Sequence, residues 1–266
     1  MAKRPVESVE VPGAVAHLVG DEPAACVWRN DYGGLTFAVG DPPSFYLKWH
    51  PHAAAPEVDL ADEAARMRWA SAWIPVPEPF ETGSDGDSSW LCTRVIDGTS
   101  AVDPRWQEDP APAVAAIGHG LRRLHDAAPV EDCPYSWSTE ERLTVARQRL
   151  ATGALPADRP VGPEPQSTAA EAMEELTTTV PDPDPVVCHG DACAPNTLLD
   201  DDGAFLALVD VGLLGVGDRW ADLAVATWSL AWNYGPGWER ELFDAYGVDA
   251  DPDLIRYYRL LWDVGP

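Results

Sequence analysis

Short apolar runs separated by Gly and Pro occupy the first third of the chain. Runs of this kind, rich in β-branched and aromatic residues, predict strands. The predicted strands are residues 25–29, 35–39, 45–49 and 89–95. The spacing of Leu60, Ala64 and Met67 instead predicts a helix, which we place at residues 59–73 before Pro75. We therefore expect an antiparallel sheet interrupted by one helix.

The apolar spacing becomes helical after Asp97-Gly98. The predicted helices are residues 112–127, 138–150, 168–178, 220–231, 237–246 and 252–262, and a hairpin is expected around a turn at residues 200–203. Segments 155–165 and 180–185 are rich in Pro and are expected to be loops. The fold class is therefore α+β with two lobes, a small sheet lobe at residues 1–97 and a larger helical lobe at residues 98–266, with a cleft where they join.

The sharpest chemical signal is the segment His189-Gly190-Asp191-Ala192-Cys193-Ala194-Pro195-Asn196, followed by Asp210. An Asp, four residues and an Asn have the spacing of a kinase catalytic loop, in which the Asp receives the proton of the substrate hydroxyl. Carboxylate and amide oxygens also suit Mg²⁺. We therefore assign Asp191 as the base, and Asn196 and Asp210 as metal ligands. The alternative is a zinc site at Cys188, His189 and Cys193, which would need further ligands from elsewhere.

Lys48 and Glu63 each lie where an unpaired charge is costly. Lys48 interrupts an apolar strand, and Glu63 falls on the apolar face of the predicted helix. A strand Lys paired with a helix Glu resolves both problems, and in protein kinases that Lys contacts the ATP phosphates. A Lys that extends to solvent beside a Glu at the helix edge is the alternative.

No phosphate-binding loop of the common glycine-rich types occurs. The segment Asn30-Asp31-Tyr32-Gly33-Gly34-Leu35-Thr36 lies between two predicted strands, and the amides of Gly33 and Gly34 would suit a phosphate. The same residues make a good hairpin turn. Both interpretations stay open.

Composition limits the class of protein. The chain has 266 residues, of which 45% are hydrophobic and 23% charged, as in soluble globular proteins, and no segment predicts an export signal or a membrane span. Five cysteines without a Cys-x-x-Cys favour a cytoplasmic location. The formal charge of -26 disfavours nucleic acid and membrane partners and favours a cationic small-molecule substrate, although it also serves solubility. We expect a monomer or a weak dimer.

Further blocks of sequence follow a known pattern. They include Asp62-Glu63-Ala64-Ala65-Arg66-Met67, Leu121-Arg122-Arg123-Leu124-His125 and Asp218-Arg219 with Asp222-Leu223-Ala224. Together with the Asp191 segment they resemble the aminoglycoside 3'-phosphotransferases of the antibiotic kinase superfamily. The resemblance implies a protein-kinase-like fold, ATP (GTP is not excluded) with Mg²⁺, and the same roles for Asp191, Asn196, Asp210, Lys48 and Glu63. It also places the adenine edge at the backbone of Arg94 and Ile96, and makes Asp222 and His125 supports of the catalytic loop.

Departures from the family pattern fall on the acceptor side. Leu213 replaces an Arg, Trp228-Ser229 replaces Arg-Asp, and Trp262-Asp263-Val264-Gly265-Pro266 replaces Asp-Glu-Phe-Phe. Asp263, with the loop residues Asp158 and Glu164, is a candidate for binding an ammonium group. We expect an ATP-dependent O-phosphotransferase that acts on an aminoglycoside and confers antibiotic resistance. The alternatives are another amino sugar, another antibiotic or a metabolite as acceptor, or a nucleotide-binding pseudokinase.

Overall fold

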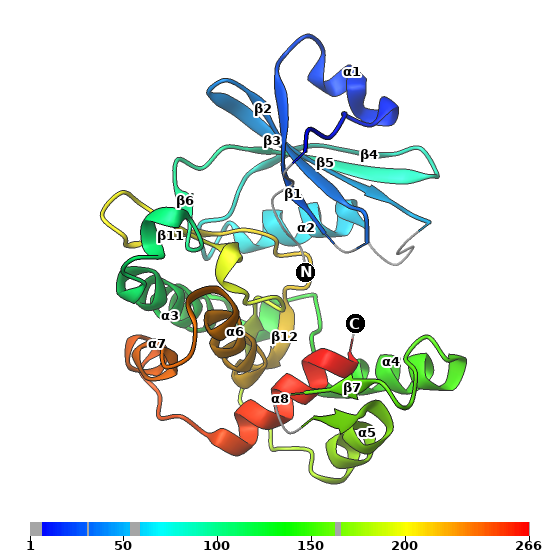
Figure 1. The fold of residues 1–266 in the computed structure, drawn as a ribbon, viewed down its shortest axis with the longest axis vertical. Helices are drawn as coiled ribbons and strands as arrows, with labels where there is room; N and C mark the ends of the chain where they lie inside the picture. The colour runs from blue at the N-terminus through cyan, green and yellow to red at the C-terminus, as the bar shows by residue number, and fades with distance from the viewer. Residues whose placement is uncertain (1–6, 31, 54–58, 163–165, 266) are drawn as a thin grey trace. The chain divides into compact units, whose positions relative to one another are not determined.

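The computed structural model describes residues 7–30, 32–53, 59–162 and 166–265. The chain divides into two compact units, Met1–Asp97 and Gly98–Pro266 (Figure 1). The first unit is built on a sheet and the second mainly on helices. The predicted α+β class is therefore confirmed.

The sheet of the first unit is antiparallel, with five strands in the order β1-β2-β3-β5-β4. They are β1 (Ala24–Arg29), β2 (Leu35–Gly40), β3 (Pro43–Pro51), β4 (Pro79–Ser84) and β5 (Ser88–Arg94). One face carries Phe37 and Leu47, whose core includes Val15 and Val19 from η1 (Gly13–Val15) and α1 (Ala16–Val19). Successive strand residues point to opposite faces. Lys48 therefore lies on the other face, which is covered by α2 (Leu60–Ala70).

Strand β4 was not predicted, because Pro79 and Gly83 are poor strand formers. Packing explains the glycine at position 83, because a Cβ there would lie 2.4 Å from the ring of Trp90. Helix α2 begins at Leu60 and is capped by Asp59, whose carboxylate accepts a hydrogen bond from the Ala61 amide at 2.8 Å. It ends at Ala70, before the predicted end, because the chain turns there ahead of Pro75.

The second unit contains all six predicted helices, with ends shifted by a few residues. They are α3 (Ala111–Ala127), α4 (Thr139–Thr152), α5 (Ala169–Thr178), α6 (Arg219–Tyr234), α7 (Glu239–Tyr246) and α8 (Pro252–Val264). Helix α3 packs on α7, and α6 packs on α8, around buried residues such as Ile117, Leu223 and Tyr258. Within the described residues, no helix is both long and apolar enough to cross a bilayer.

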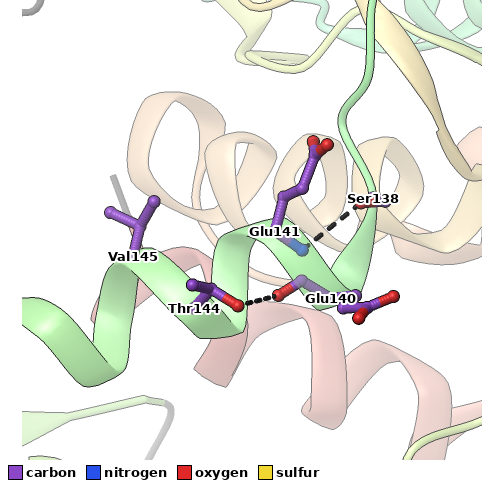
Figure 2. Close-up of a pocket in the computed structure, with 5 residues that line it drawn as sticks. All are labelled: Ser138, Glu140, Glu141, Thr144 and Val145. Atoms are coloured by element: carbon purple, nitrogen blue, oxygen red, sulfur yellow. Dashed lines mark hydrogen bonds between the residues drawn. The ribbon is translucent and has the colours of Figure 1, made fainter.

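Helices α4 and α5 both start at a sequence typical of a capping box, Ser138-x-x-Glu141 and Thr168-x-x-Glu171. The Ser138 hydroxyl accepts a hydrogen bond from the Glu141 amide at 3.3 Å, but the Glu141 side chain points away from the Ser138 backbone (Figure 2). At α5 the box is complete, because the Glu171 carboxylate also accepts from the Thr168 amide at 2.9 Å. Only the second box therefore satisfies both groups of the motif.

Short strands complete the second unit. The expected hairpin pairs β10 (Thr197–Leu199) with β11 (Phe205–Leu208), and β6 (Thr99–Ser100) joins its edge. Two further pairs were not predicted: β7 (Pro160–Val161) with β8 (Ser167–Thr168), and β9 (Pro185–Cys188) with β12 (Gly215–Asp218). At β12 the backbone of Ser136 lies where a Gly215 side chain would be, because a Cβ there would approach it to 2.6 Å.

Candidate active site

The segment from His189 to Asn196 forms a loop between β9 and β10 that is held from inside the protein. Asp222, in the first turn of α6, is 1% exposed, and its carboxylate accepts hydrogen bonds from the amides of His189 at 2.6 Å and Gly190 at 3.0 Å. A buried carboxylate with two backbone donors is a rigid anchor. Asp222 therefore braces this loop, as the resemblance implied.

His125 and Tyr246 extend the anchor. His125 Nε2 lies 3.0 Å from Asp222 Oδ2, and its Nδ1 lies 2.8 Å from the hydroxyl of Tyr246. Burial alone would raise the pKa of Asp222, but the hydrogen bond from His125 and the nearby histidines hold that pKa below its ordinary value. His125, Cys188 and Asp222 also have ligand atoms within 4.8 Å of one another. His125 and Asp222 are hydrogen-bonded to each other, and the Cys188 thiol donates to the Asp218 carbonyl at 3.2 Å, so each of the three groups has a protein partner.

The ring of His189 also makes hydrogen bonds that hold the loop. Its Nε2 lies 3.0 Å from the Val209 carbonyl, and its Nδ1 accepts from the Asp191 amide at 3.2 Å. Both ring nitrogens thus have partners, so the structure does not support the zinc alternative at Cys188, His189 and Cys193.

Asp191 lies in the middle of the loop, and one of its carboxylate oxygens lacks a hydrogen-bond donor among the described residues. Its Oδ1 is buried and accepts no hydrogen bond from the described residues. Burial first, and then the negative charge of Asp210, raise the pKa of Asp191 above its ordinary value. A buried carboxylate oxygen that lacks a hydrogen-bond donor is suited to accept a proton from a hydroxyl group.

Asn196 and Asp210 are brought to the same loop by the β10–β11 hairpin. Asn196 Nδ2 donates to the backbone carbonyl of Asp191 at 2.9 Å, and the Val209 amide donates to the Asn196 carbonyl at 2.9 Å. Asp210 has a φ of 60°, the only positive φ of a residue other than Gly in the part of the chain that the structure describes. Backbone strain of this kind is found at functional sites. The three residues expected from the spacing therefore come together in the second unit.

Lys48 and Glu63 form the expected pair within the first unit. The ammonium group of Lys48 lies 2.8 Å from Glu63 Oε2 and 3.0 Å from Oε1. The Glu63 side chain is 7% exposed and that of Lys48 24% exposed. The pair thus neutralises the buried carboxylate and leaves part of the Lys48 side chain accessible.

The turn at Gly33 and Gly34 is closed by its own hydrogen bonds. The side-chain oxygen of Asn30 accepts from the Gly34 amide at 2.7 Å and from the Tyr32 amide at 3.0 Å, and the Gly33 amide donates to the Asn30 carbonyl at 3.3 Å. The structure favours the hairpin-turn interpretation, because phosphate binding here would have to replace these bonds. Asp31 lies outside the described residues.

The two backbone positions predicted for adenine differ. The Arg94 amide donates to the Glu78 carbonyl at 2.9 Å, so this donor is already used, and its guanidinium stacks on Phe80. The backbone of Ile96 makes no hydrogen bond to any described residue. Ile96 is therefore the better of the two candidates for an adenine edge.

The predicted acceptor-binding carboxylates are unequal. Asp263 accepts from Arg159 Nη2 at 2.9 Å and from the Gly162 amide at 2.7 Å, so both its oxygens have partners. Asp158 is exposed in the turn before β7, and Glu164 lies outside the described residues. A pocket on the outer face of α4, lined by Ser138, Glu140, Glu141, Thr144 and Val145, contains none of the predicted site residues (Figure 2).

Comparison with known proteins agrees with this geometry. The model of the phosphotransferase enzyme family matches residues 28–258. The chain is 35% identical to an aminoglycoside 3'-phosphotransferase of Streptomyces fradiae over 248 residues, 88% of this chain and 91% of that one. The solved structure of an aminoglycoside 3'-phosphotransferase of type VIII is 28% identical, with a TM-score of 0.80 over 94% of this chain and 96% of the other.

A second solved structure carries ligands. An aminoglycoside phosphotransferase of Streptomyces rimosus, in complex with ADP and streptomycin, is 27% identical, with a TM-score of 0.69 over 88% of this chain and 93% of the other. These proteins share most of their length with this chain. The chain therefore belongs to the phosphotransferase enzyme family.

Proposed function

We propose that this protein transfers the γ-phosphoryl group of ATP to a hydroxyl group of an aminoglycoside. The open Oδ1 of Asp191, in a loop braced by Asp222, carries this proposal, since a hydroxyl acceptor needs a fixed base. The relatives named as aminoglycoside phosphotransferases support the substrate class. A cytoplasmic location fits both the ATP requirement and the five free cysteines.

Asn196 and Asp210 would hold Mg²⁺. Asn196 uses its amide nitrogen toward Asp191, and its Oδ1 accepts no hydrogen bond from the described residues. With the Asp210 carboxylate this gives a set of hard oxygen donors, which is what Mg²⁺ prefers. When bound, Mg²⁺ neutralises the negative charge of the phosphates. Asp191 orients the acceptor hydroxyl and receives its proton at Oδ1.

Lys48 would bind the phosphates of ATP, and Glu63 would orient the Lys48 side chain. We expect Lys48→Ala and Glu63→Ala each to lower kcat/KM for ATP, with a double variant little worse than either single one. The reason is that both substitutions break the same contact of 2.8 Å. Steady-state kinetics of the four proteins at saturating acceptor measure this coupling. Strictly additive losses would show that the ion pair does not serve ATP binding.

The acceptor is expected to be cationic, but we expect this protein to select among aminoglycosides differently from proteins that keep the family pattern on the acceptor side. The formal charge of -26 favours polyamines, and their apparent affinity should fall as salt rises. Against this, Asp263 is already paired with Arg159, and Leu213 stands where the family pattern has a cation. These features favour acceptors that need fewer charged contacts than kanamycin does.

Leu213 provides the direct test of acceptor selection. It is 36% exposed, and its backbone lies against Gly190, where a Cβ would approach the Leu213 carbonyl to 2.3 Å. We expect Leu213→Arg to change kcat/KM for kanamycin by about 5- to 150-fold, the range of one buried polar contact, and to leave ATP affinity unchanged. Arg105→Leu, on the surface of the same unit, is the control. An unchanged kanamycin efficiency in Leu213→Arg would remove this position from acceptor selection.

The function itself is tested by a phosphorylation screen with Mg²⁺ and ATP. Kanamycin, neomycin, streptomycin and uncharged sugar antibiotics serve as acceptors, and mass spectrometry detects a gain of one phosphoryl group. Phosphorylation of at least one aminoglycoside is expected. Transfer only to uncharged acceptors would favour another antibiotic or metabolite as substrate, and ATP binding without any transfer would favour a pseudokinase.

A further inference from the structure

The short turn that carries Asn196 begins with a buried amide. This turn is η4 (Ala194–Asn196), and the side chain of Cys193, the residue before it, does not cap it. The Ala194 amide instead donates to the hydroxyl group of Ser229, in α6, at 2.9 Å. Ala194 is fully buried and Ser229 is 1% exposed. A buried amide without an acceptor is costly, so the start of the turn depends on this hydroxyl group.

The Ser229 hydroxyl group is itself held in place. Asn233, one turn further along α6, donates from Nδ2 to Ser229 Oγ at 3.1 Å and to the Ser229 carbonyl at 2.8 Å. Ser229 Oγ therefore accepts from two donors, one in the turn and one in its own helix. A hydroxyl oxygen accepts at most two hydrogen bonds, so both contacts together fix its direction.

A second serine holds the turn through the opposite kind of backbone group. The hydroxyl group of Ser100, in β6, donates to the Pro195 carbonyl at 2.9 Å. Ser100 also pairs with Leu198 in β10, and the next amide, that of Ala101, donates to the Thr197 carbonyl at 2.8 Å. The turn thus has one amide bound by a serine of α6 and one carbonyl bound by a serine of β6.

The fixed turn determines where the Asn196 side chain points. The Asn196 amide donates to the Cys193 carbonyl at 2.9 Å, and its Nδ2 donates to the Asp191 carbonyl at 2.9 Å. We propose that Ser229 and Ser100 are positioning residues that direct Asn196 Oδ1 toward Mg²⁺. The inference rests on the proposed function, in which Asn196 is a metal ligand. Loss of a group that orients a metal ligand commonly lowers metal affinity or activity about 10- to 100-fold.

The kinetic test measures the Mg²⁺ concentration that gives half-maximal transfer. We expect Ser229→Ala to raise this concentration about 10-fold, with kcat at saturating Mg²⁺ within about 3-fold of the wild type. Ser100→Ala frees a half-buried carbonyl that water can reach, so a smaller rise of about 3-fold is expected. Ser100→Thr keeps the hydroxyl group and should restore the wild-type requirement. If Ser229→Ala does not fold, the two Ser100 variants decide the question.

Ser138→Ala is the matched control. The Ser138 hydroxyl group also accepts from a backbone amide, that of Glu141 at 3.3 Å, but at the start of α4. Loss of this cap should lower the melting temperature and leave the Mg²⁺ requirement unchanged. An unchanged Mg²⁺ requirement in Ser229→Ala and Ser100→Ala, even with lowered melting temperatures, would overturn the positioning role.

Amide hydrogen exchange of the metal-free protein gives a readout that does not depend on activity. The Asn196 amide, which closes the turn on the Cys193 carbonyl, should exchange faster in Ser229→Ala and Ser100→Ala, and at the wild-type rate in Ser138→Ala. Wild-type exchange in both variants would also overturn the proposal. A wild-type protein that phosphorylates no acceptor would instead reject the proposed function. Exchange and the Mg²⁺ dependence of ATP binding would then still decide the role of the two serines.

Discussion

Replacing Asp191 with Asn is expected to abolish phosphoryl transfer and to leave ATP binding intact. Removal of a general base lowers turnover by about 10² to 10⁴-fold, and an amide also orients the acceptor hydroxyl less well. The substitution preserves shape, so the backbone contacts of Asp191 with His189 and Asn196 should persist. Turnover measured beside ATP affinity separates the two effects.

The control for this prediction is Asp126→Asn. Asp126 is an exposed aspartate of α3 that pairs with Arg122 on the same helix, so turnover should not change. If Asp191→Asn retained more than about a tenth of wild-type turnover, Asp191 would not be the base.

Replacing Asp222 with Ala is expected to destabilise the second unit by about 3 to 5 kcal/mol, the usual cost of removing one member of a buried charged network. The substitution leaves the amides of His189 and Gly190 without their acceptor and removes the partner of His125. The loop that carries Asp191 loses its anchor in the same step. Chemical denaturation and the melting temperature measure the loss, and activity should fall with it.

The pH dependence of stability gives an independent check on Asp222. Its pKa is lowered in the folded protein, so its contribution to stability is present above the unfolded pKa of about 3.9 and is lost as the pH falls through the folded value. Asp222→Asn should therefore lose less stability on acidification than the wild type does. A melting temperature of Asp222→Ala equal to that of the wild type would contradict the anchoring role.

Local sequence spacing was sufficient where neighbouring residues determine the geometry. The step from Asp191 to Asn196 spans one short loop, so hydrogen bonding within that loop brings the two together. Lys48 and Glu63 were paired correctly because each had a charge that its own strand or helix could not neutralise. The six helices of the second unit were likewise found, since their apolar periodicity repeats over several turns.

Contacts between distant segments were decided only by the tertiary structure. The pairing of β9 with β12, the ion pair of Asp263 with Arg159, and the contacts of Ser229 with the catalytic loop each join residues far apart in the chain. Spacing along the chain shows which groups are available, and by itself it predicted helices α2 to α8, six of the twelve strands among the described residues, and the contact between Lys48 and Glu63. Which donor meets which acceptor depends on long-range packing, and the structure alone decided those partners.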